Sequence, residues 1–178
     1  MNIIQNTLEF SDQFLWALVL WCCGRDNLDL DTRTITTIKF RNGHTRAYRG
    51  ACWTTKNGGR FYIELGDSSR FPHTCTLHGV TTTTEDRIEG LVLVTAHELT
   101  HVKQHKMWWH ARDTTPSGRN PRGLSQILER EGELRGGLVL ELFKRNREAL
   151  LTEWRRYGSN DPDWNIVQKK ILTAAKDM

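Results

Sequence analysis

The sequence predicts an α+β fold, in which one helix precedes a set of strands and further helices follow. An apolar run over residues 14–23 has the composition of a buried helix. Residues 34–65 are rich in β-branched and aromatic residues and are interrupted by Asn-Gly signals, which is typical of strands joined by tight turns. From residue 85 onward, apolar residues recur at three- and four-residue intervals, a spacing that indicates helices.

Length and composition fit one domain that spans residues 1–178. A single hydrophobic core can serve a chain of up to about 250 residues. Hydrophobic residues make up 38% of the chain and charged residues 26%, which excludes a disordered chain and an integral membrane protein. The net charge of +4 is spread along the chain, so it permits contact with nucleic acid without requiring it.

The first expected helix covers residues 11–23. Ser11 is a typical N-cap residue, and Gly24 is a typical helix stop. The apolar run within this helix is much shorter than the roughly 20 residues that cross a bilayer, so we expect no membrane segment. No basic residue precedes the run, unlike the start of a secretory signal.

The cysteines predict a reducing compartment. They form no C-x-x-C pair of the kind that builds a zinc ribbon, and two of them are adjacent, which makes those two awkward disulfide partners. A buried free thiol behaves as a small apolar group. We therefore expect reduced thiols and a cytoplasmic location for a chain that carries Cys22, Cys23, Cys52 and Cys75.

Three runs in the first half of the chain have the character of strands. They cover Thr34–Phe40, Thr45–Thr54 and Phe61–Leu65. Asn42-Gly43 follows the first run and Asn57-Gly58-Gly59 follows the second, and these residues accept the positive φ angles of hairpin turns at little cost. We therefore expect a three-stranded antiparallel meander.

The region after the strands leads into a long helix. Residues 66–84 show no clear period, and we expect a loop or a further short strand there. A helix is expected over residues 85–110, because acids occupy its first turn and apolar residues follow at helical spacing. Prolines and glycines between residues 113 and 123 indicate a surface loop.

Two further helices are expected after this loop. The first covers Gln126–Tyr157, with Ser125 as its N-cap and a possible break near Gly136-Gly137. The second covers Trp164–Ala175 and follows a proline.

A zinc-binding pattern lies inside the helix expected over residues 85–110. The run His97-Glu98-Leu99-Thr100-His101 is H-E-x-x-H. Residues four apart share one helix face, so His97 and His101 can both bind one Zn²⁺. Glu98 projects beside that face, where it can accept a proton from water activated by the metal. The pattern therefore predicts metal-assisted hydrolysis.

A zinc hydrolase site needs a third protein ligand, and the sequence offers several. His105 lies about 12 Å along a straight helix from His97, which is too far unless the helix breaks. Glu129 and Glu133 sit one turn apart on the following helix and fit better, while His110 stays open as a further alternative. We expect Glu129 to be the ligand, with the other acid hydrogen-bonding a ligating histidine.

These motifs resemble those of the minimal gluzincin metallopeptidases, and of the small zincins that include the SprT-like and ImmA/IrrE-type proteins. Residues 95–102 are similar to the active-site helix of these families, and residues 129–133 resemble their second motif. The resemblance implies that Glu129 binds zinc and that Glu133 supports the first histidine. The departure from the pattern is Gly132, where these families usually have alanine.

The resemblance also implies a zincin-like fold and a function. It implies a zinc-dependent metallopeptidase that hydrolyses peptide bonds, with Glu98 as the general base and a peptide or protein as substrate. In these families a strand forms the upper rim of the cleft and pairs with extended substrate. We expect Phe61–Leu65 to take that role.

Two alternatives stay open. One is a zincin-fold binding or regulatory protein that holds zinc without catalysis, although the intact Glu98 favours an enzyme. The other is a SprT-like DNA-associated protease that uses the basic C-terminal half, but the chain lacks ribbon cysteines and a solvated helix face explains those charges more simply. A nucleic-acid partner is therefore not favoured, and the sequence does not indicate an oligomeric state.

Overall fold

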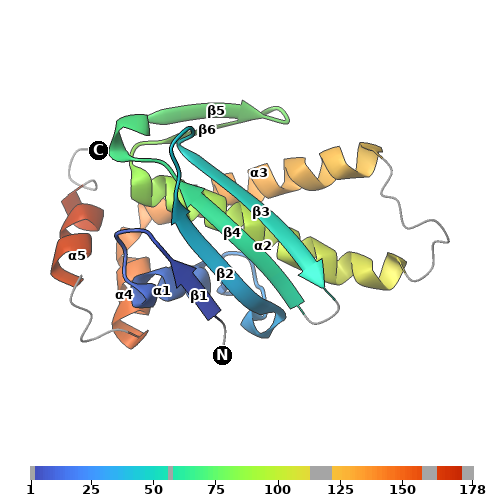
Figure 1. Cartoon of the computed structure of the whole chain (residues 1–178), viewed down its shortest axis with the longest axis horizontal. Helices are drawn as coiled ribbons and strands as arrows, with labels where there is room; N and C mark the ends of the chain where they lie inside the picture. The colour runs from blue at the N-terminus through green and yellow to red at the C-terminus, as the bar shows by residue number, and fades with distance from the viewer. Residues whose placement is uncertain (1–2, 56–57, 113–121, 158–163, 174–178) are drawn as a thin grey trace.

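The computed structural model describes residues 3–55, 58–112, 122–157 and 164–173, and it has the predicted α+β character (Figure 1). The strands are β1 (Ile3–Asn6), β2 (Ile35–Asn42), β3 (Tyr48–Thr55), β4 (Gly58–Leu65), β5 (His73–Leu77) and β6 (Val80–Thr84). The helices are α1 (Asp12–Cys23), α2 (Arg87–Arg112), α3 (Arg122–Arg145), α4 (Arg147–Tyr157) and α5 (Trp164–Thr173).

The main sheet has four strands in the order β1-β2-β4-β3, so the predicted antiparallel meander is wrong. Strands β3 and β4 form the expected antiparallel hairpin, but β2 pairs with β4 in parallel, and β1 adds a second parallel strand that the sequence analysis did not predict. Strand β4 buries Phe61, Ile63 and Leu65, which suits a central position. Strand β3 carries Arg49 and Gly50 and lies at the edge, where charged residues and glycine are tolerated.

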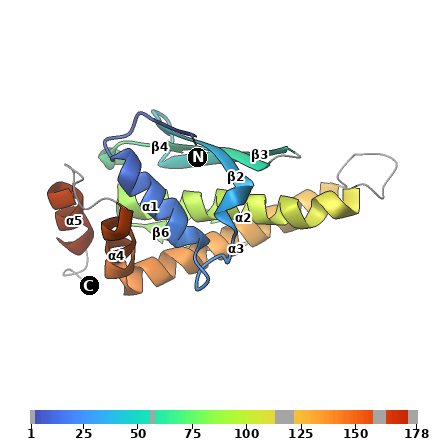
Figure 2. The ribbon, with the colours of Figure 1, turned by 90° about the horizontal axis from the view of Figure 1, so that it is seen from below.

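The helices pack on one side of this sheet, and Figure 2 shows α1, α2, α3 and α4 beneath it. Helix α1 begins as predicted, because the Ser11 side chain accepts a hydrogen bond from the Phe14 N–H, and most of its apolar residues are buried. Within the described residues, no helix is both long enough and apolar enough to cross a membrane. All four cysteines lie among the described residues and are unpaired.

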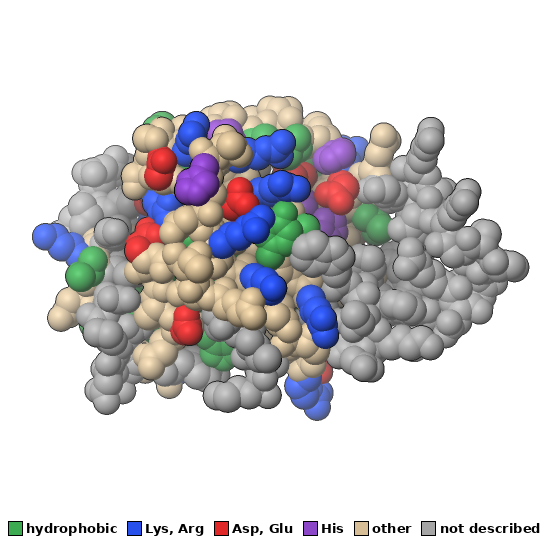
Figure 3. Space-filling view, in the orientation of Figure 1, with side chains coloured by type: hydrophobic (Ala, Val, Ile, Leu, Met, Phe, Trp, Pro, Cys, Tyr) green, Lys and Arg blue, Asp and Glu red, His purple; other side chains and the backbone are tan. Residues whose placement is uncertain are grey.

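The other face of the sheet is open and basic. Side chains on this outer face alternate with the buried ones, and Figure 3 shows basic groups gathered across it. Glu64 sits between two arginines of neighbouring strands in the pairing register and forms an ion pair with one of them, Arg41, at 2.9 Å. The basic residues of the outer face are Lys39, Arg41, Arg49 and Arg60.

Residues 66–84 contain a hairpin where the sequence predicted only a loop or one short strand. Strands β5 and β6 pair in antiparallel fashion, and hydroxyl contacts between facing threonines link them. His78 and Gly79 form the turn with φ angles of 51° and 78°, the positive values that a tight two-residue hairpin turn requires. The threonine-rich strands are mostly exposed, so they lack the alternation of apolar residues from which a strand can be predicted.

Helix α2 begins with reciprocal capping. Asp86 accepts a hydrogen bond from the Glu89 N–H at 2.8 Å, and the Glu89 carboxylate accepts one from the Glu85 N–H at 2.9 Å. These bonds satisfy N–H groups that a helix start leaves without internal partners. The helix then runs without a break to Arg112, slightly beyond the predicted end.

Helix α3 differs from its predicted bounds at both ends. It begins at Arg122, so Ser125 lies inside the helix and is not its N-cap. It continues through Gly136-Gly137 without a break. A Cβ on Gly136 would lie only 3.2 Å from the Leu93 side chain of α2, so glycine at this position allows the two helices to pack closely. The break comes at Asn146, between α3 and α4. Most of the predicted loop, residues 113–121, and the predicted end of the last helix lie outside the described residues.

A buried ion-pair network ties α4 to the start of α2. The Arg147 guanidinium is 4% exposed and contacts the fully buried Glu89 carboxylate, and Lys144 lies 3.5 Å from the same carboxylate. A charge this deeply buried is tolerated only when it is paired. The network therefore fixes where α3 ends relative to α2, the helix that carries the H-E-x-x-H pattern.

We expect Arg147→Met to lower the free energy of unfolding by about 3 kcal/mol, because it leaves the buried Glu89 charge under-compensated. Urea unfolding followed by circular dichroism measures the change. The double variant Glu89→Gln/Arg147→Met should recover most of the loss. Arg145→Met, at an exposed position of α3, is the control and should shift stability by no more than about 0.5 kcal/mol. Equal stability of Arg147→Met and the native chain would contradict this role.

Candidate metal centre

His97 and His101 face each other from consecutive turns of α2. Their Nε2 atoms lie 2.9 Å apart, and their ring planes are inclined by 81°. This arrangement follows from the four-residue spacing on an unbroken helix. The two imidazoles thus converge on one point beside the helix.

Glu129 of α3 adds a carboxylate oxygen to the two imidazole nitrogens. Its Oε2 lies 3.5 Å from His97 Nε2 and 3.4 Å from His101 Nε2. Ligand atoms on a tetrahedral zinc, at bonds of about 2.0–2.1 Å, are separated by about 3.3 Å. The three side chains therefore fit one metal ion, and the structure brings together the three residues that the sequence analysis selected.

Small residues on α3 allow this approach. A Cβ on Gly132 would lie 3.0 Å from His97 Cε1, closer than side-chain carbons normally come. Gly132, where the resembling families usually have alanine, is thus packed directly against the His97 imidazole. Gly136, one turn later, allows the same closeness to Leu93.

Glu133 lies one turn beyond Glu129 and contacts the opposite side of the first imidazole. Its Oε1 is 3.5 Å from His97 Nδ1, whereas Glu129 faces His97 Nε2. A carboxylate at Nδ1 favours the tautomer that leaves Nε2 open for a metal. The two glutamates therefore occupy different sides of the same ring.

Gln104 supports the second imidazole, and the sequence analysis did not identify it. Its Oε1 lies 2.8 Å from His101 Nδ1. Its amide nitrogen donates to the Leu128 carbonyl at 3.0 Å and to Glu131 at 3.1 Å. Gln104 follows His101 by three residues, so helical spacing alone could have drawn attention to it.

Glu98 is buried beside the imidazoles. It is 3% exposed, and its Oε2 has no hydrogen-bond partner among the described residues. Burial raises the pKa of this carboxyl to about 7, against the opposing effect of the neighbouring histidines. Edge strand β3 passes directly over it, because a Cβ on Gly50 would overlap the Glu98 carboxylate. Only glycine allows the strand to pass so close.

The other site carboxylate has the opposite tendency. Hydrogen bonding to His101 and His97 holds the pKa of Glu129 far below its usual range, so the group is a carboxylate at neutral pH. Burial alone would lower the pKa of His101, but hydrogen bonds to Glu129 and Gln104 raise it. Metal binding needs the neutral imidazole, so a raised pKa weakens binding as the pH falls.

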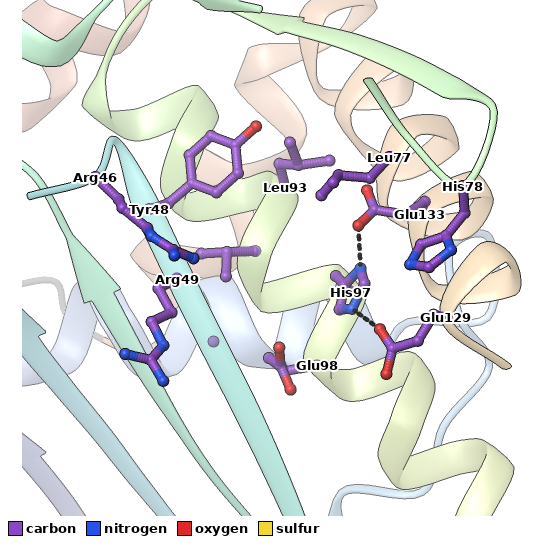
Figure 4. Close-up of a pocket in the computed structure, with 12 residues that line it drawn as sticks. Arg46, Tyr48, Arg49, Leu77, His78, Leu93, His97, Glu98, Glu129 and Glu133 are labelled. Atoms are coloured by element: carbon purple, nitrogen blue, oxygen red, sulfur yellow. Dashed lines mark ion pairs between the residues drawn. The ribbon is translucent and has the colours of Figure 1, made fainter. Parts of the chain in front are cut away.

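A cleft opens over this cluster (Figure 4). One wall, the β3 wall, is formed by Tyr48 and Arg49 of the β3 edge and by Arg46, which lies just before the strand. The opposite wall is α3 with the tip of the β5–β6 hairpin. The predicted rim strand Phe61–Leu65 is therefore wrong. It lies within β4, between two paired neighbours, whereas β3 has a free edge.

Two histidines raised as alternative ligands are not placed by the structure. The side chains of His105 and His110 lie outside the described residues. Helix α2 continues without a break past His101, so the condition for bringing His105 back to the metal is not met.

The basic residues of the C-terminal half are largely engaged within the fold. Arg147 and Lys144 pair with Glu89, Arg156 pairs with Glu153, and Arg155 lies over the Trp164 ring. Arg147 is buried and Lys144 half-buried, so these two residues do not lie on the solvated helix face that the sequence predicted, whereas Arg155 and Arg156 are exposed as expected.

Comparison of the chain with models of protein families, with curated proteins and with solved structures gave no match. The chemistry of the site therefore follows from its own geometry.

We expect the native chain to bind about one divalent metal ion, through His97, His101 and Glu129. Alanine at any of these three positions removes a direct bond and should abolish tight binding. Glu133→Ala removes only a contact to a ligating ring and should weaken affinity by about 10–100-fold. Titration with Zn²⁺ against a competing chelator measures the series, with His105→Ala as the control. Loss of metal from His105→Ala together with retention by Glu129→Ala would disprove the ligand assignment.

Gln104→Ala should weaken metal affinity by about 10–100-fold, because His101 loses the partner that orients it. Gln104→Glu keeps an acceptor oxygen near His101 Nδ1 and should retain much of the affinity. The same chelator titration compares the two variants. Equal affinity in Gln104→Ala and the native chain would show that His101 needs no such support.

Proposed function

We propose that this chain is a zinc-dependent metallopeptidase with a zincin-like arrangement. The observation that carries the proposal is the triangle formed by His97, His101 and Glu129, with the buried Glu98 carboxylate beside it. Two imidazole nitrogens and one carboxylate oxygen are a donor set that catalytic zinc sites use. The resemblance of residues 95–102 and 129–133 to the motifs of minimal gluzincins supports the same assignment.

A zinc ion held there would supply a Lewis acid that polarises a carbonyl group and acidifies water. The protein's own contribution begins with orientation. Glu133 and Gln104 contact the Nδ1 atoms of the two imidazoles and so direct both Nε2 atoms to one point. His97, Glu98 and Glu129 line the cleft, so a metal ion held there would be open to substrate and water from that side.

Glu98 is the group that moves protons. Its carboxylate lines the cleft, and one oxygen has no partner among the described residues, so it is available to a water molecule. In peptide hydrolysis it accepts a proton from the attacking water and delivers that proton to the departing amine nitrogen. This gives hydrolysis without a covalent enzyme intermediate.

Strand β3 offers a way to hold the substrate. It is the edge strand of the sheet, and its Gly50 passes directly over Glu98. An extended peptide can add to such an edge through main-chain hydrogen bonds, which position a peptide bond without depending on its side chains. The edge thus supports a peptide as the substrate class.

Glu98→Gln should retain zinc and fold but lose hydrolysis by at least about 100-fold, because the amide cannot accept the proton from water. Cleavage of an unstructured protein by zinc-loaded chain is measured with and without chelator, alongside zinc content. Glu64→Gln, a change of the same kind on the outer face of the sheet, is the control and should cleave normally. Native-rate cleavage by Glu98→Gln would refute the mechanism. Zinc binding with no cleavage by the native chain would favour an inert zinc-binding protein.

A further inference from the structure

The two walls of the cleft differ in charge. Glu129 and Glu133 line the α3 wall, and both contact the imidazole of His97. Arg46 and Arg49 line the β3 wall, and Figure 4 shows them across the cleft from the two glutamates. The two glutamates thus contact the residues of the metal cluster, while the two arginines lie on the wall beside which a peptide would bind.

The two arginines of the β3 wall, Arg46 and Arg49, are exposed. Among the described residues, no ion pair joins Arg46 or Arg49 to a carboxylate. Glu64 stands opposite Arg49 in the pairing register, but its carboxylate pairs with Arg41 instead. Two guanidinium groups therefore remain available to a ligand.

Their positions along the chain relate them to the reacting bond. Gly50 passes over Glu98, and Arg49 is its immediate neighbour. Arg49 shares the outer face of the sheet with Glu64, so it would meet a side chain that a peptide beside β3 presents on that face. Arg46 lies in the bend that precedes β3, further along the same wall of the cleft. Arg49 would thus meet a side chain next to the scissile bond, and Arg46 would meet one several residues away.

We infer that the cleft selects acidic peptide segments, with Arg46 and Arg49 as its specificity-determining residues. The inference rests on the proposed peptidase function and names its substrate class. Each guanidinium presents a planar fork of donors that matches a carboxylate in a bidentate geometry. Asp or Glu side chains flanking the cleaved bond supply those carboxylates. A peptide with basic side chains at the same positions would be repelled.

The test compares peptides that differ only in charge. An unstructured quenched fluorescent peptide carries glutamate at the residue next to the scissile bond and four residues away, on either side of the bond. Its partner carries glutamine at the same positions. We expect the zinc-loaded native chain to show a kcat/KM about 5- to 10-fold higher for the glutamate peptide, because two exposed charge contacts supply a preference of that size.

The double variant Arg46→Gln/Arg49→Gln should lower that ratio to about 1, because neither peptide then meets a guanidinium group in the cleft. The matched control is Lys39→Gln/Arg60→Gln, which removes the same charge from the outer face of the sheet but from residues that do not line the cleft. It should leave the ratio unchanged. Raising the salt from 50 to 500 mM should also reduce the native ratio, because exposed charges are screened over a Debye length of about 4 Å at high salt.

Three results would overturn the inference. They are an equal rate on both peptides, an equal loss of preference in both double variants, and displacement of the acidic peptide by an oligonucleotide of equal charge. The second and third would indicate a general polyanion surface on the sheet.

If the proposed peptidase function is wrong, the result is different, because the native chain would then cleave neither peptide. Fluorescence anisotropy of the two peptides on zinc-loaded chain still decides the inference, because it needs no turnover. Tighter binding of the glutamate peptide, lost in Arg46→Gln/Arg49→Gln, would support it, and equal binding would overturn it.

Discussion

The close approach of α3 to α2 is the constraint on which the rest of this site depends. Glycines at 132 and 136 remove the side-chain carbons that would hold the two helices apart, and the second helix then rests against His97 and Leu93. At this distance a glutamate side chain spans the gap and reaches both imidazoles. Larger residues in that seam would leave two histidines on one helix and two glutamates on another, with no shared point between them.

The same logic of close approach explains the other wall of the cleft. The sheet buries the apolar residues of β4 in its interior and places β3, which carries Gly50, at the edge. That edge then passes over Glu98 at Gly50, while the carboxylate still lines the cleft. A largely buried carboxylate beside two imidazoles, under a strand with free main-chain groups, is an environment suited to proton transfer beside a held peptide.

Charged residues play different parts at the start and in the middle of α2. Near its start, Glu89 is compensated by Arg147 and Lys144, and the result is a fixed junction with α3 and α4. Near its middle, Glu98 lies among groups that favour a bound cation, and the cleft above it carries two arginines without acidic partners among the described residues. The first arrangement holds the helix in place, and the second leaves charge available for chemistry and recognition.

Features that lie within one helix or one turn could be predicted from the order of the residues. The four-residue spacing of His97 and His101, the same spacing of Glu129 and Glu133, the cap of α1 and the β3–β4 hairpin all follow from local geometry, which the order of residues specifies. Packing across the chain set the strand order, the edge position of β3, the contact of Gln104 with His101, and the placement of Arg46 and Arg49 across the cleft from Glu129 and Glu133. These features depend on which surfaces pack together across the whole chain. Burial of β4 and the close packing of helices at glycine residues determine that arrangement. The alternation of apolar residues indicates that a strand has an apolar face, but it does not indicate which strands will pair with it.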